Sequence, residues 1–323
     1  MRFRLFLAFV PGILVAQSIA VPHSGVVFDR SPEVFRPVLG EPGAAILGDA
    51  LEIRGELHTA STCSQQQFAL AAAGREGVVT LIHLDTLKTS ALSPALVTAP
   101  NQIELSAACS AAAIYSAQAN RLQIVTGLPS KPVIAADLTP DLPGVITSLA
   151  VSDDGQLVVA VVPGKAVYAV PASGRPVSLL SIKQNAVVAM HGNPDAIMAD
   201  QSTNTVMLIA NAAGTPAITT LAGSDAGIDS PSAVWFDSRT QRVIVANGGS
   251  GKVSLLPLTG GGFDVIACGC VLAGLSPVTD RTYQLQTTAS GQPLRILDLG
   301  STPARIVFVA TPEPPAFPKG RRK

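Results

Sequence analysis

The sequence predicts an all-β protein, a β-propeller of four-stranded blades, on three observations. Runs of about five to eight residues rich in Val, Ile and Leu alternate with turns rich in Gly, Pro, Asn, Asp and Ser, which is the pattern of short strands. Three kinds of turn return in a fixed order, at a period of about 40 to 46 residues. No segment after residue 25 shows an amphipathic helical stripe with caps. Four strands repeating at this period are typical of a propeller blade, which covers its faces with its neighbours in a ring.

The stretch Ser148–Pro171, "SLAVSDDGQLVVAVVPGKAVYAVP", shows the repeating unit. An acidic Gly turn separates its first two apolar runs, and a Pro-Gly-Lys turn separates the second from the third. The continuous apolar run in "QLVVAVV" predicts a strand that is covered on both faces. The same order of turns divides the chain into six blades, at residues 52–99, 100–143, 144–185, 186–230, 231–271 and 272–312.

The polar turn that opens each unit can be located blade by blade. In chain order these turns lie near Gln65, Ser110, Asp154, Pro194, Arg239 and Asp280. Ahead of the first unit, residues 25–40 form an isolated hairpin pattern of the same kind. This hairpin either pairs with a blade at the other terminus, which would leave no open sheet edge, or belongs to an incomplete seventh blade. Six blades are favoured, and seven remain open.

The N-terminal 20 residues have the features of a signal peptide. Two arginines, Arg2 and Arg4, precede an apolar region at 5–16, and small residues lead up to Ala20, after which we expect cleavage. An uncleaved membrane anchor is the alternative, but the run is short for a span of ~20 residues and is interrupted by Pro and Gly. The expected localisation is therefore secreted or periplasmic.

The remaining organisation is one domain and a tail. Residues 21–312 are predicted to form the propeller, and residues 313–323, with a basic end after several prolines, an extended tail. The formal net charge is zero, so nothing favours nucleic acid as a partner. No later apolar run is long enough to cross a bilayer, and we expect no membrane span after cleavage.

Three segments resemble the repeats of YVTN/NHL-type bacterial propellers. Ser152–Val161, "SDDGQLVVAV", resembles their SPDG-then-strand consensus, Ala233–Leu258 resembles a whole hairpin region of such a blade, and Ala196–Ile209 is a weaker copy. The resemblance extends over about 250 residues and implies the fold. It does not fix a function, because such propellers serve as hydrolases, sugar-lactone enzymes, electron-transfer partners and binding scaffolds.

Four cysteines are the strongest candidates for a covalent link. Cys63 and Cys109 precede the first turn of successive units, which would place them close together on adjacent blades, and Cys268 and Cys270 form a C-x-C pair. In an exported protein this predicts the disulfides 63–109 and 268–270. Free buried thiols are the alternative for the first pair, and an open pair for the second. A metal site is not favoured, since paired cysteine ligands usually have two residues between them.

No other motif predicts a catalytic, cofactor or metal site. The segment "NGGSGKVS", Asn247–Ser254, lacks the first Gly and the Ser/Thr after Lys of a phosphate-binding loop, and a hairpin turn explains it. The histidines share no ligand motif, although Asp195 follows His191 by four residues, and His83 is expected to be half-buried on a strand. The four histidines are His23, His58, His83 and His191.

Carboxylates and the single tryptophan decide between the remaining classes of site. Sugar-lactonase-like propellers hold a divalent cation with a Glu, Asn and Asp set, which cannot be assembled here. The glutamates considered lie in the first third of the chain and are Glu52, Glu56, Glu76 and Glu104. Quinone-dependent propellers rely on repeated Trp residues that lock their blades together. Trp235 is the only Trp in this sequence, which disfavours that class. Trp235 and Phe236 belong to a predicted inner strand, where packing between blades is favoured over stacking on a ligand.

The sequence thus favours an exported scaffold that binds a protein or a small-molecule ligand through loops on one face of the ring. No cofactor is predicted. The alternative is a metal-assisted lactonase or other hydrolase with its site in the central channel, and Ca²⁺ is expected only in that case. A channel lined by Ala and Val favours the scaffold, and one ringed by Asp, Asn and Glu favours the enzyme.

Overall fold

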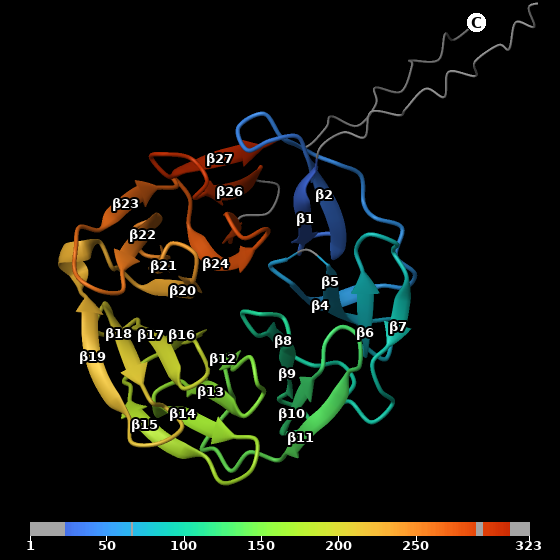
Figure 1. Cartoon of the computed structure of the whole chain (residues 1–323), viewed down its shortest axis with the longest axis horizontal. Coiled ribbons are helices and arrows are strands. Elements are labelled where there is room, and N and C mark those ends of the chain that lie inside the picture. The colour runs from blue at the N-terminus through green and yellow to red at the C-terminus, as the bar shows by residue number, and fades with distance from the viewer. Residues whose placement is uncertain (1–22, 66, 289–292, 311–323) are drawn as a thin grey trace, which may run out of the picture.

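The chain forms a ring of seven small β-sheets, each a blade, arranged around a central axis (Figure 1). The computed structural model describes residues 23–65, 67–288 and 293–310. Blade 1 has three strands, β1 (His23–Asp29), β2 (Val34–Leu39) and β3 (Ile46–Leu47), in the order β1-β2-β3. The other six blades have four antiparallel strands each, also in sequence order from the centre outward.

The strands of blades 2 to 4 follow one another with short turns. Blade 2 consists of β4 (Leu57–Thr62), β5 (Phe68–Ala73), β6 (Val78–His83) and β7 (Thr89–Ala91). Blade 3 consists of β8 (Gln102–Leu105), β9 (Ala111–Ser116), β10 (Arg121–Thr126) and β11 (Val133–Leu138). Blade 4 consists of β12 (Ser148–Val151), β13 (Leu157–Val162), β14 (Ala166–Pro171) and β15 (Val177–Ser181).

Blades 5 to 7 repeat this plan. Blade 5 consists of β16 (Ala186–His191), β17 (Asp195–Asp200), β18 (Thr205–Ala210) and β19 (Ala217–Ala222). A 3-10 turn, Ser224–Ala226, leads to blade 6, which consists of β20 (Pro231–Asp237), β21 (Arg242–Asn247), β22 (Lys252–Pro257) and β23 (Asp264–Ala267). Blade 7 consists of β24 (Leu272–Pro277), β25 (Thr282–Thr287), β26 (Leu294–Asp298) and β27 (Arg305–Val309).

The predicted propeller is confirmed, and each of the six predicted units contains one four-stranded sheet. The seventh blade, which the sequence left open while favouring six, comes from the N-terminal hairpin. Residues 25–40 supply most of β1 and β2, and β3 adds a third strand to make a separate sheet. A count of six fails because this hairpin packs between blades 7 and 2 as a blade of its own, and does not complete either neighbour.

The hydrophobic core lies between the blades. Among the described residues, seven clusters of buried side chains occur, and each combines residues of two neighbouring blades. Middle strands are covered on both faces: all six residues of β13 are buried, as its continuous apolar run predicts. Outer strands such as β15 and β19 are largely exposed. Each blade is therefore stabilised by its neighbours, which makes closure of the ring important.

The ring closes between blade 7 and blade 1 through backbone and side-chain contacts. The backbone N–H of Leu47 donates to the carbonyl oxygen of Ala310 at 2.8 Å, and Ile46 and Ala310 form a parallel bridge. Nearer the axis, Gln284 Nε2 donates to the carbonyl oxygen of Phe28 at 3.3 Å. These contacts join the two ends of the described chain, so blade 1 is a separate sheet and also closes the ring.

Two predicted segments fall outside the described residues. These are the signal peptide at 1–20 and the whole tail at 313–323, since the description ends at residue 310. Within the part of the chain that the structure describes, no helix has the length and apolar character needed to cross a membrane.

Candidate binding site in the central channel

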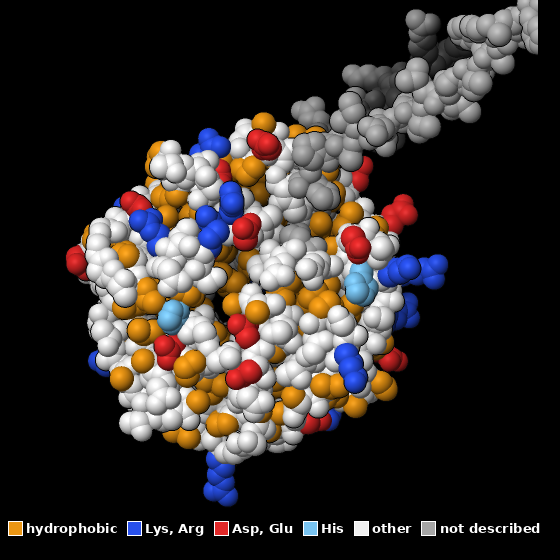
Figure 2. Space-filling model, viewed as in Figure 1, with side chains coloured by type: hydrophobic (Ala, Val, Ile, Leu, Met, Phe, Trp, Pro, Cys, Tyr) orange, Lys and Arg blue, Asp and Glu red, His pale blue; other side chains and the backbone are white. Residues whose placement is uncertain are grey.

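The central channel is lined by the innermost strands of the blades. Its main cavity has a volume of about 380 Å³, and β4, β8, β12, β16, β20 and β24 all contribute to its wall. The face shown in Figure 2 is hollowed near the centre of the disc, and acidic side chains lie beside the opening. Much of the wall is small and apolar, as at Ala150, Val188, Ala233 and Ala273.

A second, narrower cavity of about 80 Å³ opens from the same region of the channel. The two cavities share part of their walls, and we call the shared residues the throat. The throat consists of Arg30, Ala60, Glu104, Leu105, Trp235, Leu275 and Gln286. These residues come from blades 1, 2, 3, 6 and 7, so only closure of the ring brings them together.

Glu104 is the one carboxylate among the described residues that line either cavity. It lies on β8 and is half-buried, and no hydrogen bond or ion pair joins its carboxylate to any described residue within bonding distance. Burial raises the pKa of Glu104 to about 7, and the nearby positive charge of Arg30 offsets this only in part. Burial therefore disfavours ionisation of Glu104, and no described residue pairs with its carboxylate in the channel.

Arg30 is the only cation that lines the two cavities in the part of the chain that the structure describes. It follows the last residue of β1, at the start of the turn to β2. The residue is exposed overall, yet partial burial lowers the pKa of its guanidinium, and the charge of Glu104 acts in the opposite direction. Sequence reasoning did not single out Arg30, because nothing in its local pattern shows that a turn in blade 1 would face the channel.

Trp235 packs between blades, as the sequence favours, and its ring also faces the channel. It lies half-buried on the inner strand β20, its ring centroid is 6.5 Å from that of Tyr283 in blade 7, and it lines both cavities. Phe236, by contrast, is buried and meets the ring of His191 edge-on at 4.2 Å. The Trp side chain therefore packs between blades and also contributes an aromatic surface to the throat.

The remaining sequence candidates do not gather at this site. His83 is half-buried on β6, as expected, and His58 is exposed with its ring near Glu33. His191 and Asp195 face each other across the β16–β17 pair, with Nδ1 and Oδ2 3.7 Å apart, although their spacing alone did not predict this.

Three more candidates can be placed on the ring. The backbone of His23 starts β1. Glu52 and Glu56 lie between β3 and β4, and Glu76 is exposed in the turn between β5 and β6.

Neither a phosphate loop nor a metal cluster is found in the described parts of the chain. Asn247–Ser254 spans the end of β21, a tight turn and the start of β22, which agrees with the hairpin interpretation. Within residues 23–65, 67–288 and 293–310, no group of three or more His, Cys, Asp and Glu side chains is placed to hold a metal ion. The metal-assisted alternative consequently has no residue set to support it among these residues.

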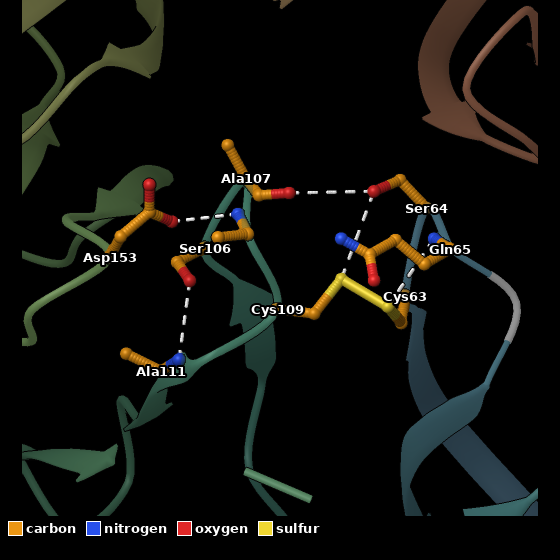
Figure 3. The surroundings of a disulfide bond; sticks show 9 residues. Cys63, Ser64, Gln65, Ser106, Ala107, Cys109, Ala111 and Asp153 are labelled. Carbon is orange, nitrogen blue, oxygen red and sulfur yellow. Dashed lines mark hydrogen bonds between the residues drawn. A yellow bond between two sulfur atoms is a disulfide. The ribbon is translucent and has the colours of Figure 1, made fainter. Parts of the chain in front are cut away.

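The four cysteines form two disulfides in the structure, at different places on the ring. Cys63, after β4, is bonded to Cys109, before β9, with their Cα atoms 5.6 Å apart, and the bond links blade 2 to blade 3 (Figure 3). Cys268 is bonded to Cys270 in the loop from β23 to β24, with a Cα separation of 5.2 Å. The first bond lies beside the narrow cavity, since Ser64 next to Cys63 lines that cavity.

Hydrogen bonds extend this linkage from blade to blade along the turns that follow the inner strands. Ser64 Oγ donates to the carbonyl oxygen of Ala107 at 3.4 Å, and the backbone N–H of Ala108 donates to Asp153 Oδ1 at 2.7 Å (Figure 3). The backbone N–H of Asp153 in turn donates to Asn193 Oδ1 at 3.1 Å. Blades 2 to 5 are thus tied together on the side of the ring where the narrow cavity lies.

Comparison with known proteins supports the fold. No protein-family model matches the chain, and no curated protein matches it. Among solved structures, a structural genomics protein of unknown function from Bacteroides thetaiotaomicron matches with a TM-score of 0.50 and 12% identity, over 77% of this chain and 71% of its own. A chain of a nidogen/laminin complex matches with a TM-score of 0.50 and 10% identity, over 73% of this chain and 90% of its own.

The class of protein that the fold defines is a seven-bladed β-propeller, with an unpaired Arg and Glu at the throat of its channel. The likeness to the two solved structures is at an identity that supports this fold alone.

Proposed function

We propose that the protein is an exported binding scaffold whose ligand site is the throat of the central channel. The observation that carries this proposal is the pair of opposite charges, Arg30 and Glu104, in the wall of both cavities without an ion pair between them. A half-buried carboxylate that makes no hydrogen bond to any described residue costs stability when it is ionised. Such groups are common at functional sites, where a ligand supplies the missing partner.

The channel wall favours binding over a metal-assisted reaction. The small apolar side chains of Ala150, Val188 and Ala233 are the lining that the sequence analysis associated with a scaffold. The throat adds an aromatic surface, Trp235, and an amide, Gln286, to the two charges. The wall therefore combines small apolar side chains with polar ones such as Thr59 and Asn101, and a concave site with a few well-placed polar groups can hold a small molecule.

Export belongs to the same proposal. The signal-peptide pattern at 1–20 favours secretion or transfer to the periplasm, and disulfides persist in those compartments. Mass spectrometry of the exported protein should give a chain that begins at Val21, with four fewer hydrogens than the fully reduced form. A chain that keeps Met1 and alkylates at all four cysteines without reductant would contradict export. Membership of the YVTN/NHL type is likewise proposed, on the segments that resemble its repeats.

Thermal unfolding in the presence of a small-molecule library tests the binding role. The mature protein is heated with representatives of four classes: carboxylates, amines, zwitterions and neutral sugars. We expect at least one class to raise Tm, because a ligand at about 100 times its Kd adds about 2.7 kcal/mol to stability. The rise should be lost in Arg30→Gln or Glu104→Gln and kept in Glu76→Gln, whose side chain is exposed away from the channel. No rise with any class, or one that all three variants keep, would refute the proposal.

A further inference from the structure

We infer that the throat binds an apolar α-amino acid as a zwitterion, with its ammonium at Glu104 and its carboxylate at Arg30. This inference rests on the proposed function and names the ligand class of the same site. Three features of the throat carry it: its two charges, its apolar wall and its size.

The first feature is that the two charges face one space and stay apart. Arg30 comes from blade 1 and Glu104 from blade 3, both line both cavities, and no described contact brings their charged atoms within 4.0 Å. Among the described residues, no other Asp, Glu, Lys, Arg or His lines either cavity. A simple cation would be attracted by Glu104 but repelled by Arg30. A simple anion would be attracted by Arg30 but repelled by Glu104. A ligand that carries both charges is attracted by both residues.

The second feature is the apolar remainder of the throat. Ala60, Leu105, Leu275 and the ring of Trp235 lie between and around the charges, and Gln286 adds the only other polar side chain. Burial of an apolar side chain against such a wall is favourable by about 25 cal/mol per Å².

The third feature is size. The narrow cavity has a volume of about 80 Å³ and shares the throat residues with a cavity of about 380 Å³. A single amino acid therefore fits with its charged end at the throat and its side chain in the channel. A folded protein domain does not fit, and a protein partner would have to dock on the rim instead.

The pH dependence of ligand affinity, set by protonation of Glu104, is a second way to test the inference. The pKa of Glu104 lies at about 7 in the folded protein, and Arg30 is the only charged group that faces it from the neighbouring strands of the channel. A bound ammonium favours the ionised carboxylate, so binding releases a proton below pH 7. The affinity should rise about tenfold per pH unit below 7 and level off above it.

Calorimetric titration with L-leucine tests the inference. The matched probes are L-leucine amide, which lacks the carboxylate, and N-acetyl-L-leucine, which lacks the ammonium. We expect L-leucine to bind at least about 10-fold more tightly than either probe, because each leaves one charge of the throat without its partner. Arg30→Gln and Glu104→Gln should each weaken L-leucine by a similar factor, and Glu76→Gln should leave it unchanged.

The outcomes separate this inference from the proposed function. No heat with L-leucine at about 10 mM, or equal binding of either probe, would overturn the inference. If another class in the thermal library still raises Tm through Arg30 or Glu104, the binding role stands and only the ligand class is wrong. If no class raises Tm, both fail.

Discussion

Replacement of Glu104 by Gln should stabilise the folded ring, and only above neutral pH. The pKa of Glu104 lies at about 7 in the folded protein, against an ordinary value of 4.5, because burial disfavours the charged form. Below pH 4.5 the carboxyl is protonated in both the folded and the unfolded chain, and it costs nothing. Between pH 4.5 and 7 the unfolded chain releases the proton while the folded chain keeps it, so folded-state stability falls with rising pH.

The size of the effect follows from the same two pKa values. Each pKa unit corresponds to about 1.4 kcal/mol, so the penalty above pH 7 is about 3 kcal/mol. Gln has the shape of Glu without the titration. We therefore expect Glu104→Gln to raise the free energy of unfolding by about 3 kcal/mol at pH 8 and to change it by less than about 0.5 kcal/mol at pH 4.

Urea denaturation at pH 4, 6 and 8, followed by circular dichroism, measures this difference. Glu76→Gln is the matched control, because Glu76 is exposed in a turn, and it should show no such pH dependence. An equal effect of Glu104→Gln at pH 4 and pH 8, or a loss of stability at pH 8, would refute the reasoning. A gain at pH 8 would mean that the protein retains a destabilising carboxylate at its throat, which is the trade-off expected of a binding site.

Three further predictions concern the ring itself. The double variant Cys63→Ala/Cys109→Ala opens a loop that spans 46 positions, and the chain-entropy model predicts a loss of about 4 kcal/mol in the free energy of unfolding. For a ring of roughly 290 residues this lowers the calorimetric Tm by about 6 °C. An unchanged Tm would contradict the prediction. Phe35→Ala should cost about 3–5 kcal/mol in urea, because Phe35 is fully buried between blades 1 and 2, and a loss below about 1 kcal/mol would show that blade 1 is not part of the cooperative core. Gly251→Ala should lower the free energy of unfolding in urea more than Gly192→Ala. Both glycines have positive φ, but a Cβ at Gly251 would lie 2.3 Å from a backbone carbonyl oxygen, whereas a Cβ at Gly192 would meet open space. Equal losses of stability would contradict the close approach at Gly251.

The blades could be predicted from the sequence because their signals are local. The run Leu157–Val162 between two turns predicts a strand covered on both faces, whatever the rest of the chain does. Turns such as the one at Asp154 recur at a constant spacing and set the boundaries of the units. The hairpin at residues 25–40 was ambiguous, since its pattern is the same whether it joins a neighbour or stands alone. That outcome depends on contacts with Val278 and Ile296, far away in sequence.

The throat could not be predicted, because its residues have no common spacing. Glu104 and Trp235 were noted separately, as one of a few glutamates and as the only tryptophan, and Arg30 was not noted at all. They belong to blades 3, 6 and 1, and only closure of the ring places them around the same cavities. The link between Cys63 and Cys109 was easier to anticipate, because equivalent positions of successive blades are neighbours in any propeller.

The pKa of Glu104 is the most direct test of the claim that the throat is a binding site. It can be measured by ¹³C NMR of the Glu side-chain carboxyl groups, with the Glu104 signal assigned by its loss in Glu104→Gln. The structure predicts a pKa of about 7 in the free protein and a lower value when L-leucine is bound, since the ammonium favours the carboxylate. A pKa near 4.5 that does not move with ligand would mean that Glu104 is solvated, and would contradict the site.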